Sequence, residues 1–145
     1  MPAQPNVPPI DREVTFQDEG FEAKTLMTKT DLKGTITYAS KAFRVMSGYS
    51  KEELIGQRHS IVRHPDMPAA VFKEMWDTIK ANKRWEGYIK NLRKDGKYYW
   101  VNIKVEPIYD EEGNKIGYLG VRSEPERDSL EEVKARYKKL LSYEK

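Results

Sequence analysis

The sequence predicts an α+β domain built on one antiparallel sheet of five strands. Three observations predict this fold class. The chain has 145 residues, which is enough for one domain with a hydrophobic core. Two β-rich runs come early in the chain and three come late. Between the two groups lie capping residues and apolar side chains at helical spacing, and short helices in this position are typical of the α+β class.

The first 22 residues are expected to lie outside the domain. Four of the eight prolines fall in residues 2–9, and a mobile tail is predicted there because proline neither continues a helix nor fits a central strand. Residues 10–22 fit either a short helix or an extended lead-in. The predicted organisation is therefore a tail and lead-in over 1–22, one domain over 23–126, and a signalling or linker helix over 127–145.

The early strands are predicted from KTLMTKTDLKGTITYAS, which contains two short β-rich runs around a turn at Asp31–Gly34. Ser40 follows the second run and is a suitable N-cap for a short helix that Gly48 ends. Ser50 and Glu53 have the spacing of a capping box, which predicts a second short helix.

Irregular structure is expected over HSIVRHPDMP because Pro65 and Pro68 both break a local helix. A longer amphipathic helix is predicted from Pro68 to Ala81, since apolar residues recur there at steps of one, three and four. These apolar residues are Val71, Phe72, Met75, Trp76 and Ile79.

The late strands are predicted from RWEGYIKNLR, KYYWVNIKVEPIYD and KIGYLGVRSEP. Asp95-Gly96 lies between the first two runs and is a strong hairpin signal, and DEEGN turns the chain into the third run.

The last predicted helix is DSLEEVKARYKKLLSYEK, with an N-cap at Asp128 and Glu131 three residues on. Its narrow apolar seam fits packing on the sheet of its own domain, or the start of a coiled coil toward a partner or an output domain, and we favour the second. The seam consists of Leu130, Val133, Tyr137 and Leu140.

Composition argues against several functional classes. The net charge is only +3, from 26 basic and 23 acidic residues, so a nucleic-acid partner is not expected. The chain has no cysteine, which excludes disulfides, thiolate chemistry and cysteine-ligated zinc or iron–sulfur clusters. No Ser/His/Asp arrangement, phosphate-cradling glycine loop or spaced pair of carboxylates predicts an enzyme. A cytoplasmic location is expected, alone or in association with a membrane-bound receptor.

Three segments resemble the PAS domain family: GTITYASKAFRVMSGYSKEELIGQ, WEGYIKNLRKDGKYYWV and PIYDEEGNKIGYLGV. The resemblance covers roughly residues 24–124. Within the family, the chain is similar to the aerotaxis-receptor type through LMTKTDLKGTIT, RHPDMP and the pattern W-x-G-x-x-K-N. The resemblance implies a PAS fold, with the short helices and the longer helix on one face of the five-stranded sheet and a C-terminal helix in addition.

The resemblance also implies a function. The aerotaxis-receptor type carries FAD in a pocket between the sheet and the short helices, and relays the redox state of this flavin in oxygen or energy taxis. The chain is therefore expected to be a non-catalytic sensory module. Its expected partners are a chemotaxis-type transducer or output domain, in the same chain or a separate protein, and a second copy of itself in a homodimer.

Carried onto this chain, the resemblance implies that RHPDMP contacts FAD. Arg63 suits the pyrophosphate, because a guanidinium forms paired, charge-assisted hydrogen bonds with phosphate oxygens. His64 is able to hydrogen-bond a phosphate, a ribose or the flavin edge. Asp66 has two roles open to it: fixing the tautomer of His64, or capping the helix that starts near Pro68.

Further FAD contacts are implied at Trp85 and Asn91. Trp85 offers a broad face for stacking on a ring or closing the pocket. Asn91 is expected to transmit the signal, because reduction turns an acceptor nitrogen of the flavin into a donor and an amide is able to turn over in response. Ser40 is also implied as a cofactor contact; it stands where the family tends to show asparagine, and its hydroxyl side chain is shorter and carries one donor. Trp76 and Trp100 are expected to be packing residues.

Two other functions stay open from the residues alone. One is a haem-binding PAS gas sensor, with His59 or His64 as the axial ligand. The other is a cofactor-free PAS module that mediates dimerisation. The two histidines lie five positions apart with no cysteine to join them, so no metal-ion site is predicted.

Overall fold

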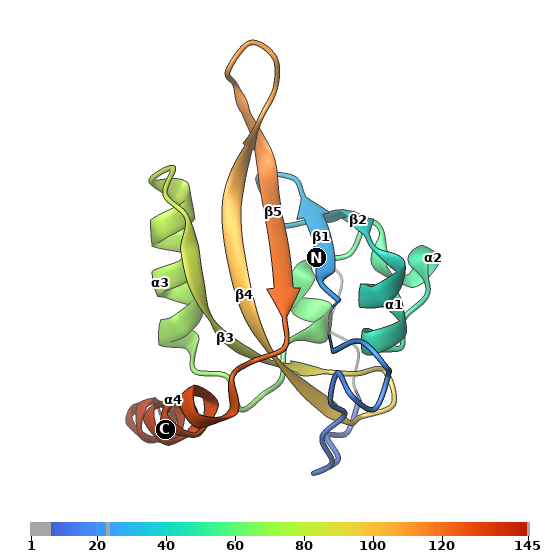
Figure 1. Ribbon diagram of the computed structural model, residues 1–145. Coiled ribbons are helices and arrows are strands. Elements are labelled where there is room, and N and C mark those ends of the chain that lie inside the picture. The colour runs from blue at the N-terminus through green and yellow to red at the C-terminus, as the bar shows by residue number, and fades with distance from the viewer. Residues whose placement is uncertain (1–6, 23, 145) are drawn as a thin grey trace.

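The computed structural model describes residues 7–22 and 24–144 and confirms the predicted fold class (Figure 1). Five strands form one antiparallel sheet in the order β2-β1-β5-β4-β3. The strands are β1 (Leu26–Thr30), β2 (Ile36–Ala39), β3 (Trp85–Leu92), β4 (Tyr98–Tyr109) and β5 (Lys115–Ser123). The helices are α1 (Lys41–Ser47), α2 (Lys51–Leu54), the 3₁₀ helix η1 (His59–Val62), α3 (Ala69–Lys80) and α4 (Arg127–Tyr143).

The turn between β1 and β2 forms where the sequence predicts it. One carboxylate oxygen of Asp31 accepts hydrogen bonds from the backbone N–H groups of Lys33, at 2.9 Å, and Thr35, at 3.0 Å. Gly34 has a φ of +87°, a left-handed conformation that glycine adopts without steric cost. The turn is therefore specified locally.

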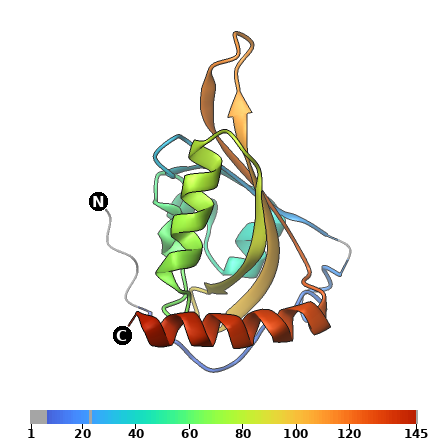
Figure 2. The same ribbon diagram turned by 90° about the vertical axis from the view of Figure 1, so that its left-hand side faces the viewer.

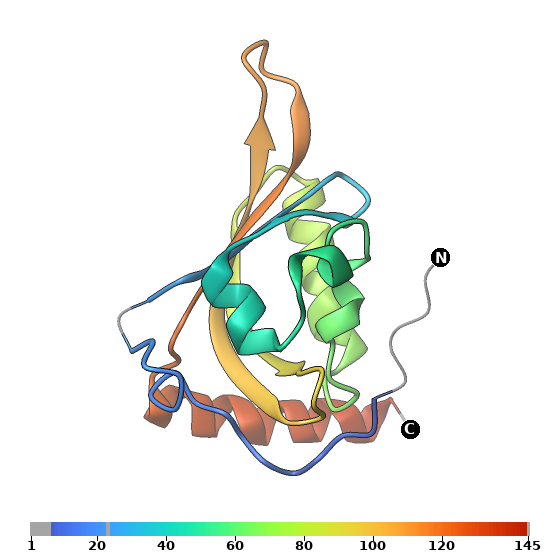
Figure 3. The ribbon, with the colours of Figure 1, turned by 90° about the vertical axis from the view of Figure 1, so that its right-hand side faces the viewer.

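The predicted caps of the two short helices α1 and α2 are confirmed. Ser40 Oγ accepts from Phe43 N at 3.3 Å and so caps α1, which ends at Gly48 with a φ of +80°. Ser50 and Glu53 form the reciprocal hydrogen bonds of a capping box at the start of α2. Together with η1 and α3, these helices cover one face of the sheet, as the views in Figures 1 and 3 show.

The segment HSIVRHPDMP is irregular apart from η1, and α3 follows it. Val71 and Ile79 are buried on the inner side of α3, and Phe72, Met75 and Trp76 pack partly buried against the same core. The predicted amphipathic pattern therefore faces the sheet.

The three late strands form two hairpins, as predicted. Gly96 and Gly113 lie in the connecting turns with φ values of +91° and +83°. The β4–β5 hairpin projects beyond the rest of the sheet (Figure 1), and Tyr109 and Ile116 near its tip are about half exposed.

The lead-in is extended rather than helical where it meets the domain. Ile10 N donates to the carbonyl of Gly96 and Val14 N to the carbonyl of Tyr98, each at 2.7 Å. Phe16 then enters the hydrophobic core with 1% of its surface exposed. Residues 10–22 therefore belong to the packed domain. The predicted mobile tail lies largely outside the described residues, since only 7–9 of it are described.

Helix α4 packs on its own domain, which is the alternative that we did not favour. Leu130, Val133 and Tyr137 of the predicted seam are buried, and the rings of Tyr137 and Trp100 lie 6.1 Å apart. In Figures 2 and 3 the helix runs across one end of the sheet.

The predicted N-cap of α4 is wrong. Glu126, rather than Asp128, caps the helix, because its carboxylate accepts from Asp128 N at 3.0 Å and Ser129 N at 2.8 Å. Asp128 lies in the first turn instead, where its negative charge suits the positive end of the helix dipole. Among the described residues, no helix is both long enough and apolar enough to cross a membrane.

Candidate functional site

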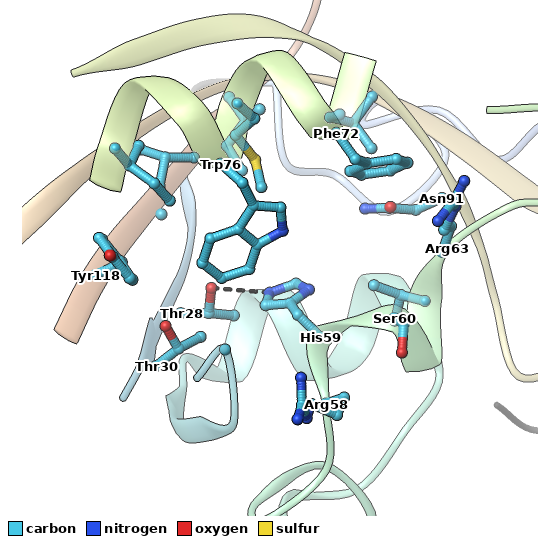
Figure 4. A pocket seen from close by; sticks show the side chains of 18 of the residues that line it. Thr28, Thr30, Arg58, His59, Ser60, Arg63, Phe72, Trp76, Asn91 and Tyr118 are labelled. Carbon is cyan, nitrogen blue, oxygen red and sulfur yellow. Dashed lines mark hydrogen bonds between the residues drawn. The ribbon is translucent and has the colours of Figure 1, made fainter. Parts of the chain in front are cut away.

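A cavity of about 240 Å³ lies between the sheet and the helices η1 and α3 (Figure 4). Its walls are mainly apolar. Phe72, Met75, Trp76 and Ile79 of α3 form one wall, and Ile89, Ile103 and Val105 of β3 and β4 contribute to the facing wall. The alternation of side chains along β3 and β4 directs these strand residues to the same face of the sheet.

Trp76 and Tyr118 give the cavity a rigid aromatic corner. Their rings meet edge to face, with centroids 5.7 Å apart and an interplanar angle of 84°. Gly34 makes room for the indole, since a Cβ at this position would lie 3.1 Å from Trp76 Cη2. The absence of a side chain in the β1–β2 turn therefore helps to set the position of Trp76.

A polar cluster formed by Thr28, His59 and Arg122 lines another part of the cavity. His59 Nε2 lies 2.8 Å from Arg122 Nη2 and 3.1 Å from Thr28 Oγ1, the second contact being the dashed line in Figure 4. An arginine side chain only donates, so His59 Nε2 must be the acceptor and the ring proton must lie on Nδ1. Burial, with the positive charge of Arg122 as a second cause, lowers the pKa of His59 to about 3.

Arg122 is a buried cation, with only 3% of its surface exposed. Its guanidinium lies 4.8 Å from the Phe43 ring centroid and makes long hydrogen bonds, of 3.4 Å, to the carbonyls of Leu26 and Gly120. Burial lowers the pKa of Arg122 to about 10, which leaves it protonated at neutral pH. In the part of the chain that the structure describes, no carboxylate forms an ion pair with it. An uncompensated buried charge is costly, and a ligand that presents negative charge or oxygen acceptors would offset that cost.

Asn91 and Arg63 are the two predicted site residues that line the cavity, and the structure brings them together. Their backbones pair as an antiparallel bridge between RHPDMP and β3. The guanidinium of Arg63 lies 4.4 Å from the Phe72 ring centroid, and Asn91 is 3% exposed. Both side chains are labelled in Figure 4.

His64 and Asp66 do not line the cavity, and both stabilise the RHPDMP loop. His64 is buried, and its Nδ1 accepts from the backbone N–H of Asp66 at 3.0 Å. That backbone group, rather than the Asp66 carboxylate, fixes the tautomer of His64. The carboxylate forms an ion pair with Lys90 at 3.2 Å instead. Asp66 therefore fixes the tautomer of His64 as predicted, although through its backbone, and the prediction that it caps α3 is wrong.

Trp85 and Ser40 also lie outside the cavity lining. Trp85 is buried over Gly87 at the start of β3, and its Nε1 donates to the carboxylate of Glu74 at 2.9 Å. The Oγ of Ser40 is shared between Phe43 N in α1 and Met27 N in β1, at 3.3 and 3.1 Å. Each side chain is held by contacts within the fold.

Sequence reasoning missed several cavity residues. Thr28 and Arg122 were not predicted, His59 was considered only as a haem ligand, and Trp76 was predicted to be a packing residue. A signal for Arg122 exists in the sequence, because it shares the strand face of Tyr118 and Gly120 in a central strand, where a charged residue is unusual.

The geometry gives haem little support. The single lone pair of His59 Nε2 already faces the donors Arg122 Nη2 and Thr28 Oγ1, and iron coordination through this atom would displace both contacts. His64 Nδ1 is bound within the loop, and its ring lies outside the cavity lining. Within residues 7–22 and 24–144, no cluster of histidine and acidic side chains is suited to a metal ion.

Known proteins with the same fold support this description. A family model described as the PAS fold matches residues 36–122. The aerotaxis receptor of Escherichia coli (strain K12) is 44% identical over 116 residues, which is 80% of this chain and 23% of the receptor. The nitrogen fixation regulatory protein of Klebsiella pneumoniae is 31% identical over 101 residues, 70% of this chain and 20% of that protein. The chain thus spans less than a quarter of the length of these relatives.

A solved PAS domain of a protein from Colwellia psychrerythraea is similar in structure as well. It is 29% identical to this chain with a TM-score of 0.63, and the match covers 75% of this chain and 93% of that one. The sheet order, the helices on one face and the cavity between them agree with the sequence matches. The chain belongs to the PAS-fold family.

Proposed function

We propose that this domain is a non-catalytic sensory module that binds FAD in the cavity and relays its redox state to a partner or an output domain. The observation that carries the proposal is an apolar cavity with a buried, uncompensated guanidinium in its lining. An isoalloxazine ring has flat apolar faces and an edge of oxygen and nitrogen acceptors. Such a ring would place its faces between α3 and the sheet and its acceptors near Arg122 and Asn91.

The size of the cavity suits the flavin ring, and the charge at its mouth suits the rest of FAD. A cavity of about 240 Å³ is a little smaller than typical ligand pockets of roughly 300–1,000 Å³, so it suits one ring system rather than a whole dinucleotide. Lys33, Arg58 and Arg63 are the more exposed cations of its lining. These three side chains are suited to a pyrophosphate at the mouth of the cavity.

Bound FAD would supply electron acceptance, with uptake of electrons and protons on its ring. The protein's own residues would set which state is favoured. Arg122 would favour a ligand state with more negative charge, because its own charge is poorly compensated in the fold. The amide of Asn91 is able to donate or accept, and it belongs to β3, so a reorientation there would act directly on the sheet.

The proposed signalling context follows the aerotaxis receptor. The partner would be a chemotaxis-type transducer or an output domain, in this chain or in a separate protein, and the domain would work in the cytoplasm beside or within a membrane-bound receptor. A homodimer is part of the proposal. The support is the 44% identity to the receptor and the agreement of the cavity with the implied flavin pocket.

The first experiment is the visible absorption spectrum of the purified protein, followed by heat release and chromatography of any chromophore. Flavin bands with released FAD are expected. Released FMN would keep the sensory function but correct the cofactor. A sharp haem band would instead favour a haem-binding sensor with a histidine as the axial ligand. A colourless protein that takes up neither FAD nor haem would favour a cofactor-free dimerisation module.

Substitutions at the cavity then test where the flavin lies. Arg63→Ala and Asn91→Ala are expected to reduce flavin retention, whereas Arg84→Ala serves as a control because this arginine is exposed and does not line the cavity. Equal retention in all three variants would contradict the proposed location.

A further inference from the structure

Helix α3, which forms one wall of the cavity, has no cap from its own part of the sequence. Its N-cap residue is Pro68, which makes no side-chain capping hydrogen bond, and no acidic residue lies in its first turn. The first backbone N–H groups of a helix have no partner within the helix, so they need one from elsewhere.

Glu144 supplies that partner from the end of α4. Its Oε1 accepts from Ala69 N at 3.1 Å and its Oε2 accepts from Ala70 N at 3.2 Å. A carboxylate suits this position because it both accepts hydrogen bonds and complements the helix dipole. Figure 2 shows the C-terminal end of α4 below the start of α3.

Two further contacts hold α4 on the domain. The Tyr137 hydroxyl donates to the carbonyl of Tyr88 in β3 at 2.7 Å, and Arg127 forms an ion pair with Glu13 at 3.0 Å. Helix α4 and the residue that ends it therefore contact α3, β3 and the lead-in through hydrogen bonds and an ion pair.

Two of these elements, α3 and β3, also form walls of the cavity. Phe72 lines the cavity one turn after Ala69 in α3, and Trp76 lines it one turn further on. Ile89 follows Tyr88 in β3 and also lines the cavity. A ligand that shifts or orders either wall therefore acts on the groups that hold α4.

We propose that Glu144 is a positioning residue for the cavity, and that its cap on α3 joins ligand binding and docking of α4 into one coupled equilibrium. The ligand in this statement rests on the proposed function, namely FAD. Coupling of this kind is reciprocal: if docked α4 favours ligand binding, then bound ligand must favour docked α4 by the same factor.

The test compares Glu144→Ala and Glu144→Gln with Glu132→Ala, a control that removes an exposed carboxylate elsewhere on α4. The dissociation constant for FAD is expected to rise about five-fold in Glu144→Ala, as for the loss of a helix cap. A smaller rise, of roughly two-fold, is expected in Glu144→Gln, which keeps an acceptor but not the charge. Glu132→Ala should bind FAD as the unsubstituted protein does.

Amide hydrogen exchange supplies a second readout on the same proteins. FAD is expected to slow exchange over residues 137–143 in the unsubstituted protein, and this effect should be lost in Glu144→Ala. Even without FAD, Glu144→Ala should exchange faster through Phe72 and Trp76, beyond the two capped amides.

Two results would overturn the coupling: unchanged FAD affinity in Glu144→Ala, or faster exchange confined to Ala69 and Ala70. Failure of the proposed function would look different, because the unsubstituted protein itself would then fail to bind FAD. In that case the exchange through Phe72 and Trp76 still decides whether Glu144 positions the cavity wall.

Discussion

Burial keeps both histidines of this chain in the neutral form, and this gives the fold a defined dependence on pH. The pKa of His59 is lowered to about 3 and that of His64 to about 4, in each case mainly by burial, with a nearby cation as the second cause. Unfolded histidine titrates near 6.5, so the unfolded chain takes up protons first as the pH falls. The stability that these two residues contribute is therefore complete above pH 6.5 and is lost progressively as the pH falls, down to about pH 4 for His64 and about pH 3 for His59.

His64→Asn isolates one of the two contributions. Asparagine is able to accept from the backbone N–H two residues on, as His64 Nδ1 does from Asp66, but it does not titrate. Near pH 5 each histidine contributes up to about 1.4 kcal/mol per pH unit to the slope of the unfolding free energy. Urea unfolding between pH 5 and 6 should therefore give roughly half the slope in the variant. An unchanged slope would mean that His64 is already protonated in the native protein.

Arg122→Met separates function from stability at a single residue. Among the described residues no carboxylate pairs with Arg122, so an apolar side chain of similar length removes the cost of burying a charge and leaves no opposite charge unpaired. The unfolding free energy of the ligand-free protein is expected to stay within about 1 kcal/mol or to rise, while the dissociation constant for FAD rises at least about ten-fold. The two quantities come from urea unfolding and FAD titration, with exposed Arg84→Met as the control. A large loss of stability with unchanged FAD affinity would make Arg122 a structural residue.

At the scale of single elements, the indole of Trp85, the first residue of β3, packs closely over Gly87 in the same strand, and this contact predicts the effect of a substitution. A Cβ on Gly87 would overlap Trp85 Cη2 and lie 2.6 Å from Cζ2 of the same ring. The indole is buried and held by Glu74, so it has little freedom to move away. Gly87→Ala is expected to lower the unfolding free energy by about 1–3 kcal/mol.

A double-mutant cycle tests the cause of that loss. In a Trp85→Leu background the clash is removed, and Gly87→Ala should cost clearly less than in the unsubstituted protein. An equal cost in both backgrounds would place the effect in the strand backbone rather than in the indole.

Locally determined elements are the ones that the sequence predicts well. The Ser40 cap, the capping box of Ser50 and the turn at Asp31 each depend on residues at most four positions apart, and all three are confirmed. The cap of α3 could not be predicted in this way, because Glu144 lies 75 positions from Ala69. Only the folded chain brings these two residues together.

In the candidate site, too, local sequence patterns predict less than the contacts between residues that are far apart in the chain. Arg63 is the residue of the motif RHPDMP that lines the cavity, but a motif does not say which of its side chains point inward. His64 and Asp66 instead hold the loop itself. The polar cluster combines residues of β1, η1 and β5, which are distant in sequence, so no local pattern joins Thr28, His59 and Arg122.

At the scale of the whole molecule, the lead-in is part of the core although it precedes the matched family region. Phe16 is 1% exposed, and removing a buried phenylalanine side chain usually costs about 3–5 kcal/mol. Phe16→Ala should lower the unfolding free energy by that amount. Gln17→Ala, at the exposed neighbouring position, should change it by less than about 0.5 kcal/mol. Equal effects in urea unfolding would mean that the lead-in does not contribute to the core.

The order of the strands in the sheet has a consequence for folding during synthesis on the ribosome. The first strand, β1, pairs with the last, β5, so that Leu26 lies opposite Arg122. Synthesis runs from the N-terminus, so nearly the whole domain is synthesised before β5 is available to pair with β1. Pairing over so long a separation is slow because a large loop has to close first. Since Thr28 and Arg122 meet only when β5 joins the sheet, the cavity is incomplete until then, and a ligand that contacts both residues binds only after β5 has been synthesised.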